Sequence, residues 1–360
     1  MRERIGILTG GGDCPGLNTV IRAVVKSATK RGWDTLGFLD GYEGLLEPVR
    51  YRQLDYKEMD ALLFVGGTIL GTSNKGRFAA KTGHGEANRI STEVLTAAKA
   101  NIQKLALRAL VCVGGDGSLS IAQQLFEHGV PVIGVPKTID NDLEATETTF
   151  GFDSAVACAT DALDRLRTTA QSHDRVMVLE VMGRYAGWIA VHAGVSGGGD
   201  VILIPEIPFC YEAVCAKIAE RENEGKHFTL IVAAEGAREK GKDYVTAGSA
   251  EKNREARLGG VGGVIAAEIQ KRTRKETRVC VLGHLQRGGA PTSFDRLLCT
   301  RFGAKAVQLI DEKRYGQMVA LKAGETVSVK LTEAVGHLRN VPADGDIVGT
   351  AKALGISFGD

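Results

Sequence analysis

The feature that most constrains the fold of this 360-residue chain is a recurring order: a short, continuous apolar run, then a glycine-rich or polar turn, then a stretch with helical periodicity. Continuous apolar runs rich in β-branched residues are typical of strands buried on both faces, as in parallel sheets. Their alternation with helical stretches predicts a doubly wound α/β fold. The predicted strands are IGIL, LLFV, ALVCV, PVIGV, VMVLEV, VILIP and TLIVAA, and the clearest helical stretches are 17–31, 121–127 and 153–169.

The chain length predicts more than one domain, since a single hydrophobic core seldom organises more than about 250–300 residues. The sequence has no proline- or serine-rich linker between two parts, so interleaved domains are possible. The tail after about Gly336 shows weak patterning, and no role is assigned to it.

Composition excludes several classes of partner. The formal net charge is +2, from 45 basic and 43 acidic residues, which argues against nucleic acid or an anionic membrane as the main partner. The apolar run at 5–8 is too short for the core of a signal peptide, and no run approaches the roughly 18 residues of a membrane span. Seven scattered cysteines without a CxxC pair indicate neither a disulfide framework nor a zinc site. We therefore expect a cytoplasmic protein.

Two glycine-rich loops follow predicted strands and precede helical stretches: Thr9–Gly16, TGGGDCPG, and Gly114–Ser118, GGDGS. Consecutive glycines can turn backbone N–H groups toward one anion, and the helix N-terminus adds partial positive charge. The first loop alone is equally consistent with an ordinary tight turn, but the two together favour a nucleotide or polyphosphate site. In the second loop, Asp116 can hold a Mg²⁺ that bridges phosphates, and Ser118 can cap the next helix while donating to a phosphate.

The segment Pro136–Asp142, PKTIDND, suits acid–base chemistry. In an extended stretch Asp140 and Asp142 project to the same side, because the side-chain period is two. One carboxylate can then accept a hydroxyl proton while the other places a metal or orients its partner. Lys137 and Thr138 add a cation and a hydroxyl suited to a transferring phosphoryl group. A polar surface loop is the simpler interpretation, and it would be preferred without the two glycine loops.

Five segments together resemble the phosphofructokinase family: GGDCPGLN, GGDGS, PKTIDND, MGRYAG and LGHLQRGG, in the family's order and separations between about residues 4 and 310. The resemblance implies a glycolytic 6-phosphofructokinase, which with Mg²⁺ transfers a phosphoryl group from ATP to the 1-hydroxyl of fructose 6-phosphate. It also implies two Rossmann-like, three-layer α/β/α domains with an interleaved chain. Residues 1–150 plus about 286–336 would form the phosphoryl-donor domain, and residues 151–285 plus about 337–360 the fructose 6-phosphate domain.

The resemblance further implies roles for single residues. Asp140 is expected to be the general base and Arg184 the cation that stabilises the transferred group, with Lys137, Thr138 and Asp142 close by. The expected donor site comprises Gly12, Gly115, Asp116, Gly117 and Ser118, with Asp116 as the metal ligand. The expected fructose 6-phosphate site comprises Thr138, Asp140, Arg175, Met182, Gly183, Arg184, Glu235, Arg278, His284 and Arg287. Arg175 and Arg278 would reach in from a neighbouring subunit, which implies a homo-oligomer, either a dimer or a tetramer, with shared active sites.

Three positions bear on the choice of donor. Gly117 leaves room for the α-phosphate of a nucleotide, whereas pyrophosphate-dependent members usually carry Asp there. Lys137 is typical of pyrophosphate users, and Asn74 stands where ATP-specific relatives usually have Arg. The chain thus resembles the family's mixed group. Since steric exclusion is harder to overcome than a surplus charge, we predict ATP; a pyrophosphate-dependent fructose-6-phosphate 1-phosphotransferase is the alternative.

Three other classes of protein fit the sequence less well. A lipid or dinucleotide kinase with a GGDG loop would lack PKTIDND and LGHLQRGG in this arrangement. A catalytically silent nucleotide sensor would have lost Asp116, Asp140 or Arg184, and all three are present. An NAD-dependent oxidoreductase would need a glycine fingerprint after a strand, and the glycines at 259–263 follow no apolar run, so they are better read as a flexible loop or a helix start.

Overall fold

The computed structural model describes residues 2–73, 76–78, 89–246 and 259–360. The chain forms two compact units, each built from separate stretches of sequence. Unit 1 comprises Met1–Ile139, Leu143–Ser154 and Arg287–Leu338, and unit 2 comprises Asp140–Asp142, Ala155–Gln286 and Arg339–Asp360. Each unit has its own sheet with helices on both faces, which confirms the predicted α/β class.

Unit 1 contains a seven-stranded sheet in the order β11-β10-β5-β4-β1-β2-β3. The central strands run parallel, and β3 and β11 are antiparallel at the two edges. The strands are β1 (Arg4–Thr9), β2 (Asp34–Phe38), β3 (Tyr51–Leu54), β4 (Leu107–Gly114), β5 (Val132–Pro136), β10 (Gln317–Lys322) and β11 (Glu325–Lys330).

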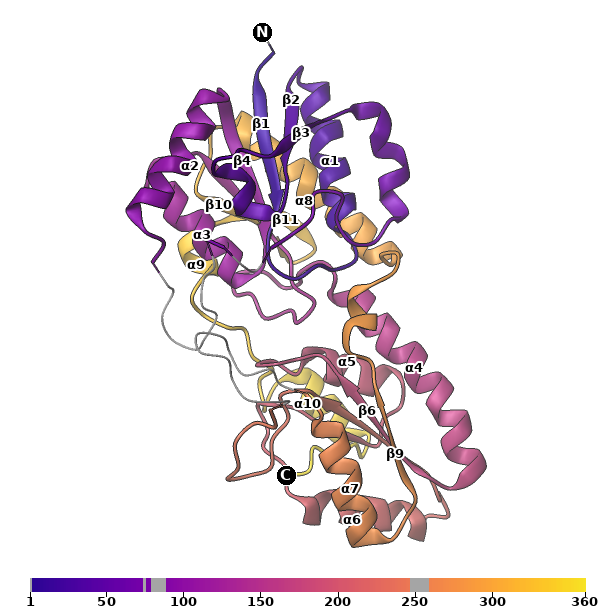
Figure 1. Ribbon diagram of the computed structural model, residues 1–360. Helices are drawn as coiled ribbons and strands as arrows, with labels where there is room; N and C mark the ends of the chain where they lie inside the picture. The colour runs from indigo at the N-terminus through magenta and orange to yellow at the C-terminus, as the bar shows by residue number, and fades with distance from the viewer. Residues whose placement is uncertain (1, 74–75, 79–88, 247–258) are drawn as a thin grey trace. The chain divides into compact units, whose positions relative to one another are not determined.

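Helices cover both faces of this sheet (Figure 1). On one face α1 (Leu17–Lys30) packs against α8 (Ser293–Asp311). On the other face α2 (Thr92–Lys104), α3 (Asp116–Glu127) and the short α9 (Leu331–Ala334) contribute leucines and alanines to the buried core. Two 3₁₀-helices, η1 (Gly41–Leu45) and η2 (Tyr56–Phe64), lie in the connections.

Unit 2 contains a four-stranded parallel sheet in the order β7-β8-β6-β9. Its strands are β6 (Val176–Val181), β7 (Val201–Leu203), β8 (Thr229–Ala234) and β9 (Thr277–Val281). Helices α6 (Tyr211–Asn223) and α7 (Val261–Thr273) cover one face, and α4 (Phe152–His173), α5 (Trp188–Ser196) and α10 (Asp346–Ala353) lie on the other. The 3₁₀-helix η3 (Gly283–Arg287) follows β9.

One predicted strand is wrong. LLFV, at 62–65, does not join a sheet, because Tyr56–Phe64 forms the 3₁₀-helix η2. The Asp55 side chain caps this helix by accepting a hydrogen bond from Lys57 N at 2.9 Å. Only Met59 and Leu62 are buried there, at the three-residue spacing of a 3₁₀-helix, whereas Phe64 is 56% exposed. An apolar run by itself does not distinguish a strand from a helix.

The other predicted strands are confirmed, although two of the three predicted helices, α3 and α4, extend beyond the predicted stretches. Helix α3 begins at Asp116 rather than Ile121, and the glycines at 259–263 lead into the start of α7. The tail beyond Gly336, predicted to be weakly patterned, forms α10 and joins unit 2 through a hydrogen bond from Ile202 N to Ser357 O. No helix of the described residues is both long enough and apolar enough to cross a membrane.

Two helix N-termini of unit 1 are tied together by the buried carboxylate of Asp295. It accepts hydrogen bonds from Gly151 N at 3.0 Å, Ser154 N at 2.9 Å and Ser154 Oγ at 2.6 Å, and so satisfies the first turn of α4. In return Thr292, the N-cap of α8, donates through its N–H to Ser154 Oγ and through Oγ1 to Asp153. Burial raises the pKa of Asp295 to about 6, because desolvation disfavours the charged carboxylate.

Asp295→Asn is expected to change how stability depends on pH. The folded-state pKa of about 6 lies above the ordinary value of 3.8, so the folded protein binds this proton more tightly than the unfolded chain. The resulting stabilisation is complete below about pH 4 and is lost as pH rises through about 6, an effect on the order of 3 kcal/mol. The variant lacks this titration.

Calorimetry should therefore show the thermal midpoint of the wild type falling relative to that of Asp295→Asn between pH 4 and 6. Asp311→Asn removes an exposed carboxylate from the same helix and serves as the control. A difference between wild type and Asp295→Asn that stays constant over this range would contradict the raised pKa.

Candidate active site

Three predicted site loops leave neighbouring strands at one edge of the unit 1 sheet. Strands β1, β4 and β5 pair in parallel, so their carboxyl ends meet. Gly10 N donates to Val113 O at 2.8 Å, and Lys137 N donates to Gly114 O at 2.9 Å. The strand order reverses between β1 and β4, which is the switch point where doubly wound sheets bind ligands. The fold thus brings together both glycine loops and the start of PKTIDND.

Ser118 lies where the two glycine loops meet. A Cβ on Gly10 would stand 2.7 Å from Ser118 Oγ, and one on Gly114 would stand 2.3 Å from Ser118 Cβ, so only glycine fits at both positions. The prediction that Ser118 caps the following helix is wrong, because α3 begins two residues earlier and its N-cap is Gly115. Ser118 instead lies in the first turn, where its carbonyl accepts a hydrogen bond from the Tyr42 hydroxyl at 2.6 Å.

Asp116 is the first residue of α3 and lies in the half-buried second glycine loop. Gly336 N donates to its Oδ1 at 2.9 Å, which orients the carboxylate. A single carboxylate beside backbone amides fits Mg²⁺, which usually takes one or two carboxylates and completes its shell with phosphates and water. Within the described ranges no group of three or more His, Cys, Asp and Glu side chains is arranged to hold a metal alone. These residues therefore suit a cation that arrives with the donor phosphates.

Two cations lie against the first glycine loop. Lys137 is 3% exposed, and its Nζ donates to Gly12 O. Arg287 donates from Nη1 to Asp13 O at 3.0 Å, and a Cβ on Gly12 would stand 2.8 Å from the same nitrogen. Arg287, predicted as a sugar phosphate contact, thus binds the donor loop of unit 1. Both cations add positive charge where a polyphosphate is expected.

The acid–base segment turns where an extended course was predicted. Ile139 and Asp140 form a turn, and Asn141 has a φ of 52°, in the left-handed region that asparagine tolerates better than most residues. The premise that Asp140 and Asp142 project to one side of an extended strand is therefore wrong. Strand β5 ends at Pro136, and the next residue, Lys137, forms only an isolated bridge with Phe150.

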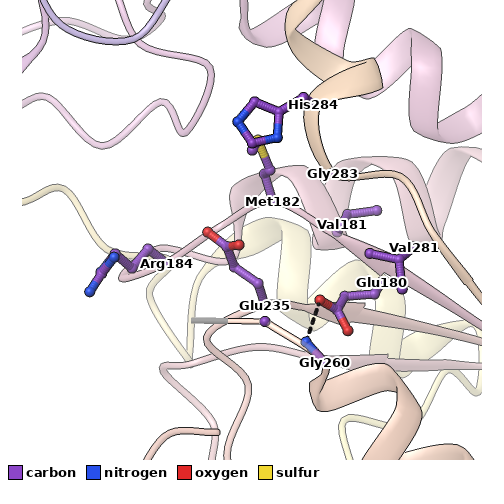
Figure 2. A pocket seen from close by; sticks show the side chains of 10 residues that line it. Glu180, Val181, Met182, Arg184, Glu235, Gly260, Val281, Gly283 and His284 are labelled. Atoms are coloured by element: carbon purple, nitrogen blue, oxygen red, sulfur yellow. Dashed lines mark hydrogen bonds between the residues drawn. The ribbon is translucent and has the colours of Figure 1, made fainter. Parts of the chain in front are cut away.

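Unit 2 has a pocket of about 380 Å³ at the carboxyl edge of its sheet. Strands β8, β6 and β9 are neighbours there, and the loops that follow them form the wall. Four predicted fructose 6-phosphate residues come together around this pocket: Met182, Arg184, Glu235 and His284 (Figure 2). The other lining residues are Glu180, Val181, Gly259, Gly260, Val281 and Gly283.

The polar groups of this pocket suit a phosphorylated polyol. Glu235 and Glu180 bring carboxylates, which accept hydrogen bonds from hydroxyl groups. Arg184 brings a guanidinium that can bind phosphate in a bidentate way, and it lies over the Tyr185 ring at 5.3 Å. Gly183, also predicted, has a φ of +134°, and a Cβ there would lie 2.8 Å from Ala186 O. A glycine is therefore required beside Arg184.

Two supporting residues were missed from the sequence. Glu180 is 3% exposed and accepts hydrogen bonds from Gly260 N at 3.1 Å and Gly262 N at 2.7 Å, which holds the start of α7 at the pocket wall (Figure 2). Gln286 is 1% exposed, and its Oε1 accepts from Met182 N at 2.9 Å. A carboxylate inside the apolar run VMVLEV was the signal for Glu180, because a buried charge needs partners.

Arg175 and Arg278 do not reach this pocket within one chain. Arg175 precedes β6 and Arg278 is the second residue of β9, so both lie at the amino edge of the sheet. The six residues of β6 separate that edge from the carboxyl edge by roughly 15 Å. Both guanidinium groups pair with Glu276, at 2.9 and 2.5 Å. The hydrogen bond from Arg175 lowers the pKa of Glu276 below its usual range.

Gly236→Ala is expected to displace the loop that carries Arg184. Gly236 N donates to Gly183 O at 3.1 Å, and a Cβ at this position would stand 2.0 Å from Arg184 O. Backbone must shift to relieve this contact, at a cost of about 1–3 kcal/mol. A lowered thermal midpoint is the expected result.

Gly349→Ala is the matched control, since a Cβ there would meet nothing within 4 Å and alanine favours the helix by about 1 kcal/mol. Equal midpoints for the wild type and Gly236→Ala would contradict the close approach.

Asn74, one of the three positions that bear on the choice of phosphoryl donor, lies outside the described residues.

Sequence comparison identifies relatives over the whole chain. ATP-dependent 6-phosphofructokinase of Chloroflexus aurantiacus is 54% identical over 359 residues, covering 100% of this chain and 98% of the relative. ATP-dependent 6-phosphofructokinase 2 of Clostridium perfringens is 47% identical over 362 residues, 99% of each chain. Pyrophosphate–fructose 6-phosphate 1-phosphotransferase of Amycolatopsis methanolica is 48% identical over 343 residues, 95% of this chain and 97% of the relative.

Solved structures share the fold. Pichia pastoris phosphofructokinase in the T-state matches with a TM-score of 0.81 at 28% identity; the match covers 99% of this chain but 37% of that longer one. Pyrophosphate-dependent phosphofructokinase from Nitrosospira multiformis matches with a TM-score of 0.80 at 20% identity, over 99% and 92% of the two chains. The family model for phosphofructokinase matches residues 4–310. The chain therefore belongs to the phosphofructokinase family.

Proposed function

We propose that this protein is a 6-phosphofructokinase. With Mg²⁺ it transfers the γ-phosphoryl group of ATP to the 1-hydroxyl of fructose 6-phosphate, giving fructose 1,6-bisphosphate and ADP in glycolysis, which implies a cytoplasmic location. The observation that carries the proposal is a pair of complementary sites, one in each unit. Unit 1 has glycine loops at its switch point, and unit 2 has a pocket with Arg184, Glu235 and His284. Relatives of this name at 47–54% identity support it.

The donor phosphates are assigned to the loops of unit 1. The proposed contacts are the backbone amides of Gly12, Gly115 and Gly117, together with Ser118. Asp116 would hold Mg²⁺, which neutralises charge on the donor phosphates when bound. The N-terminus of α3 adds partial positive charge at the same loop.

The acceptor is assigned to the pocket of unit 2. Asp140 is the proposed base: it takes the proton of the 1-hydroxyl, whose oxygen forms a bond to the γ-phosphorus as the bond to ADP breaks. Arg184 would stabilise charge on the transferring group, a role worth on the order of 10³–10⁵ in rate. Thr138, Lys137 and Asp142 are proposed to assist near that group, and the proposed sugar phosphate contacts are Met182, Gly183, Glu235, His284 and Arg287.

A second copy of the chain is proposed to complete the sugar phosphate site. Arg175 and Arg278 lie at the opposite edge of the sheet from the pocket of their own chain, so they would serve a neighbour's pocket. Strand β9 ends the sheet order, and its residues Val279 and Val281 are 42% and 54% exposed. This apolar edge supports association, and we propose a dimer or tetramer.

Pyrophosphate is the second candidate donor, favoured by Lys137 and by the Amycolatopsis methanolica relative. The buried Lys137 ammonium donates to Gly12 O, so at least one of its three N–H groups is already engaged by the protein, which supports ATP. Fructose 1,6-bisphosphate formation with ATP and with pyrophosphate should be compared. We expect faster turnover with ATP, and loss of ATP use in Gly117→Asp because the side chain would crowd the α-phosphate.

Gly349→Ala, far along the chain in α10, is the control for the glycine change. Turnover mainly with pyrophosphate would instead favour the alternative donor. Turnover with neither donor would contradict the enzyme assignment and support a nucleotide sensor.

Asp140→Asn is expected to lower kcat by about 10²–10⁴, because the amide cannot accept the hydroxyl proton. The KM for fructose 6-phosphate should change little, since the pocket residues of unit 2 are untouched. Steady-state kinetics with Asp161→Asn as control, an exposed carboxylate of α4, provide the check. An unchanged kcat in Asp140→Asn would remove Asp140 from the role of base.

A further inference from the structure

The residues Arg339–Val341, here called the tail strap, lie beyond the residues 4–310 that match the family model. The sequence assigned no role to this stretch. In unit 2 the tail strap contacts the acid–base segment and Trp188, the first residue of α5, through the hydrogen bonds and ring contact given below. The acid–base segment carries the proposed base, and the loop 182–187 directly before Trp188, here called the Arg184 loop, carries the proposed charge-stabilising cation.

The first contact is with the acid–base segment. Arg339 N donates to Asp142 O at 2.9 Å, and Arg339 Nη1 lies 3.4 Å from Asn141 O as a longer, charge-assisted donor. Asn141 is 3% exposed and has a positive φ, so its backbone is in neither a helix nor a strand. Carbonyls outside regular structure need partners from elsewhere, and Arg339 donates to those of two successive residues, Asn141 and Asp142.

The second contact is with Trp188, the first residue of α5, which directly follows the Arg184 loop. Trp188 Nε1 donates to Arg339 O at 2.8 Å, and the Arg339 guanidinium lies over the Trp188 ring, 4.4 Å from its centroid. A cation over an indole face is favourable, and more so when it is partly withdrawn from water. One side chain therefore stacks on the residue that follows the Arg184 loop and donates to the acid–base segment at the same time.

Glu206 binds the tail strap next to these contacts. Its Oε1 accepts hydrogen bonds from Gly187 N at 3.0 Å and from Val341 N at 2.8 Å. Gly187 is the N-cap of α5, directly before Trp188, and a Cβ there would stand 3.0 Å from Glu206 Oε2. The strap and the end of the Arg184 loop are thus held by the same carboxylate.

We propose that Arg339 is a positioning residue that couples the Asp140 segment to the Arg184 loop. The proposal rests on the proposed function, because it gives the two coupled segments catalytic roles. Displacement of a reacting group by about 1 Å can cost about 10² in rate. Loss of the guanidinium would loosen both segments together and leave the pocket walls at Met182 and His284 in place. Turnover would fall more than substrate binding.

Kinetics of three variants of the full chain test this coupling. Arg339→Ala is expected to lower kcat roughly 10- to 100-fold, with KM for fructose 6-phosphate and ATP within about threefold. Arg339→Lys keeps the charge but lacks the planar group that can both stack and donate, so it should recover only part of kcat. Lys352→Ala, which removes the exposed ion pair with Asp360 from the same tail, should match the wild type.

Hydrogen exchange gives a readout that does not need activity. In Arg339→Ala, deuterium uptake should rise in peptides covering 138–143 and 182–188, and stay unchanged in β8. Trp188→Phe keeps an aromatic face for the guanidinium and removes the Nε1 donor, so it should raise uptake in the same peptides to a smaller extent. This milder variant, with Arg339→Lys, keeps the test valid if Arg339→Ala folds poorly.

The outcomes separate this proposal from the proposed function. A wild type that forms no fructose 1,6-bisphosphate overturns the function, while exchange still tests the coupling. An active wild type with unchanged kcat and unchanged exchange in Arg339→Ala overturns the positioning role. The positioning role is also overturned if the fraction of kcat lost in Arg339→Ala equals the fraction of unfolded protein measured by circular dichroism and exchange at 138–143 does not rise. In that case Arg339 serves only to dock the tail on unit 2.

Discussion

Parallel pairing of β1, β4 and β5 is the constraint on which the proposed donor site depends. It brings the loops at 9–16 and 114–118 and the start of PKTIDND to one sheet edge, although more than a hundred residues separate the first from the last. The backbone hydrogen bonds from Gly10 to Val113 and from Lys137 to Gly114 continue this pairing into the loops themselves. Glycine is required where the loops touch, because Ser118 fills the space that side chains on Gly10 and Gly114 would need.

Unit 2 also has its candidate site at the carboxyl edge of a parallel sheet, but with different chemical groups. The ends of β6, β8 and β9 surround a pocket with two carboxylates, a guanidinium and an imidazole, in place of amide-rich glycine loops. A site made of amides and helix N-termini suits a polyphosphate, whereas carboxylates and a guanidinium suit hydroxyls with a phosphate. One architecture used twice therefore presents two sites that suit the two substrates proposed for the phosphoryl transfer.

Buried polar side chains fix the position of loop segments whose backbone amides have no partner in a helix or strand. Glu180 and Asp295 each accept two hydrogen bonds from backbone amides at a helix start. Glu206 accepts from Gly187 N at the start of α5 and from Val341 N in the tail, and Gln286 accepts from Met182 N. Such groups are costly to bury without partners, so a satisfied carboxylate ties a loop to one position. The tail strap likewise holds irregular backbone in place, and we propose that it couples the segment with the proposed base to the loop with the proposed charge-stabilising cation.

The sequence by itself determined the α/β class, six of the seven predicted strands, and the residue types of the loops, because burial on both faces and glycine-rich turns leave local patterns. The family motifs supplied the proposed roles of Asp116, Asp140 and Arg184. Only the tertiary structure decided that LLFV is helical, that the acid–base segment turns at Asn141, and that Arg175 and Arg278 lie across the sheet from the pocket. It alone placed the tail strap on Trp188 and Asp142. These features depend on contacts between residues far apart along the chain, and such contacts leave no periodicity in one sequence.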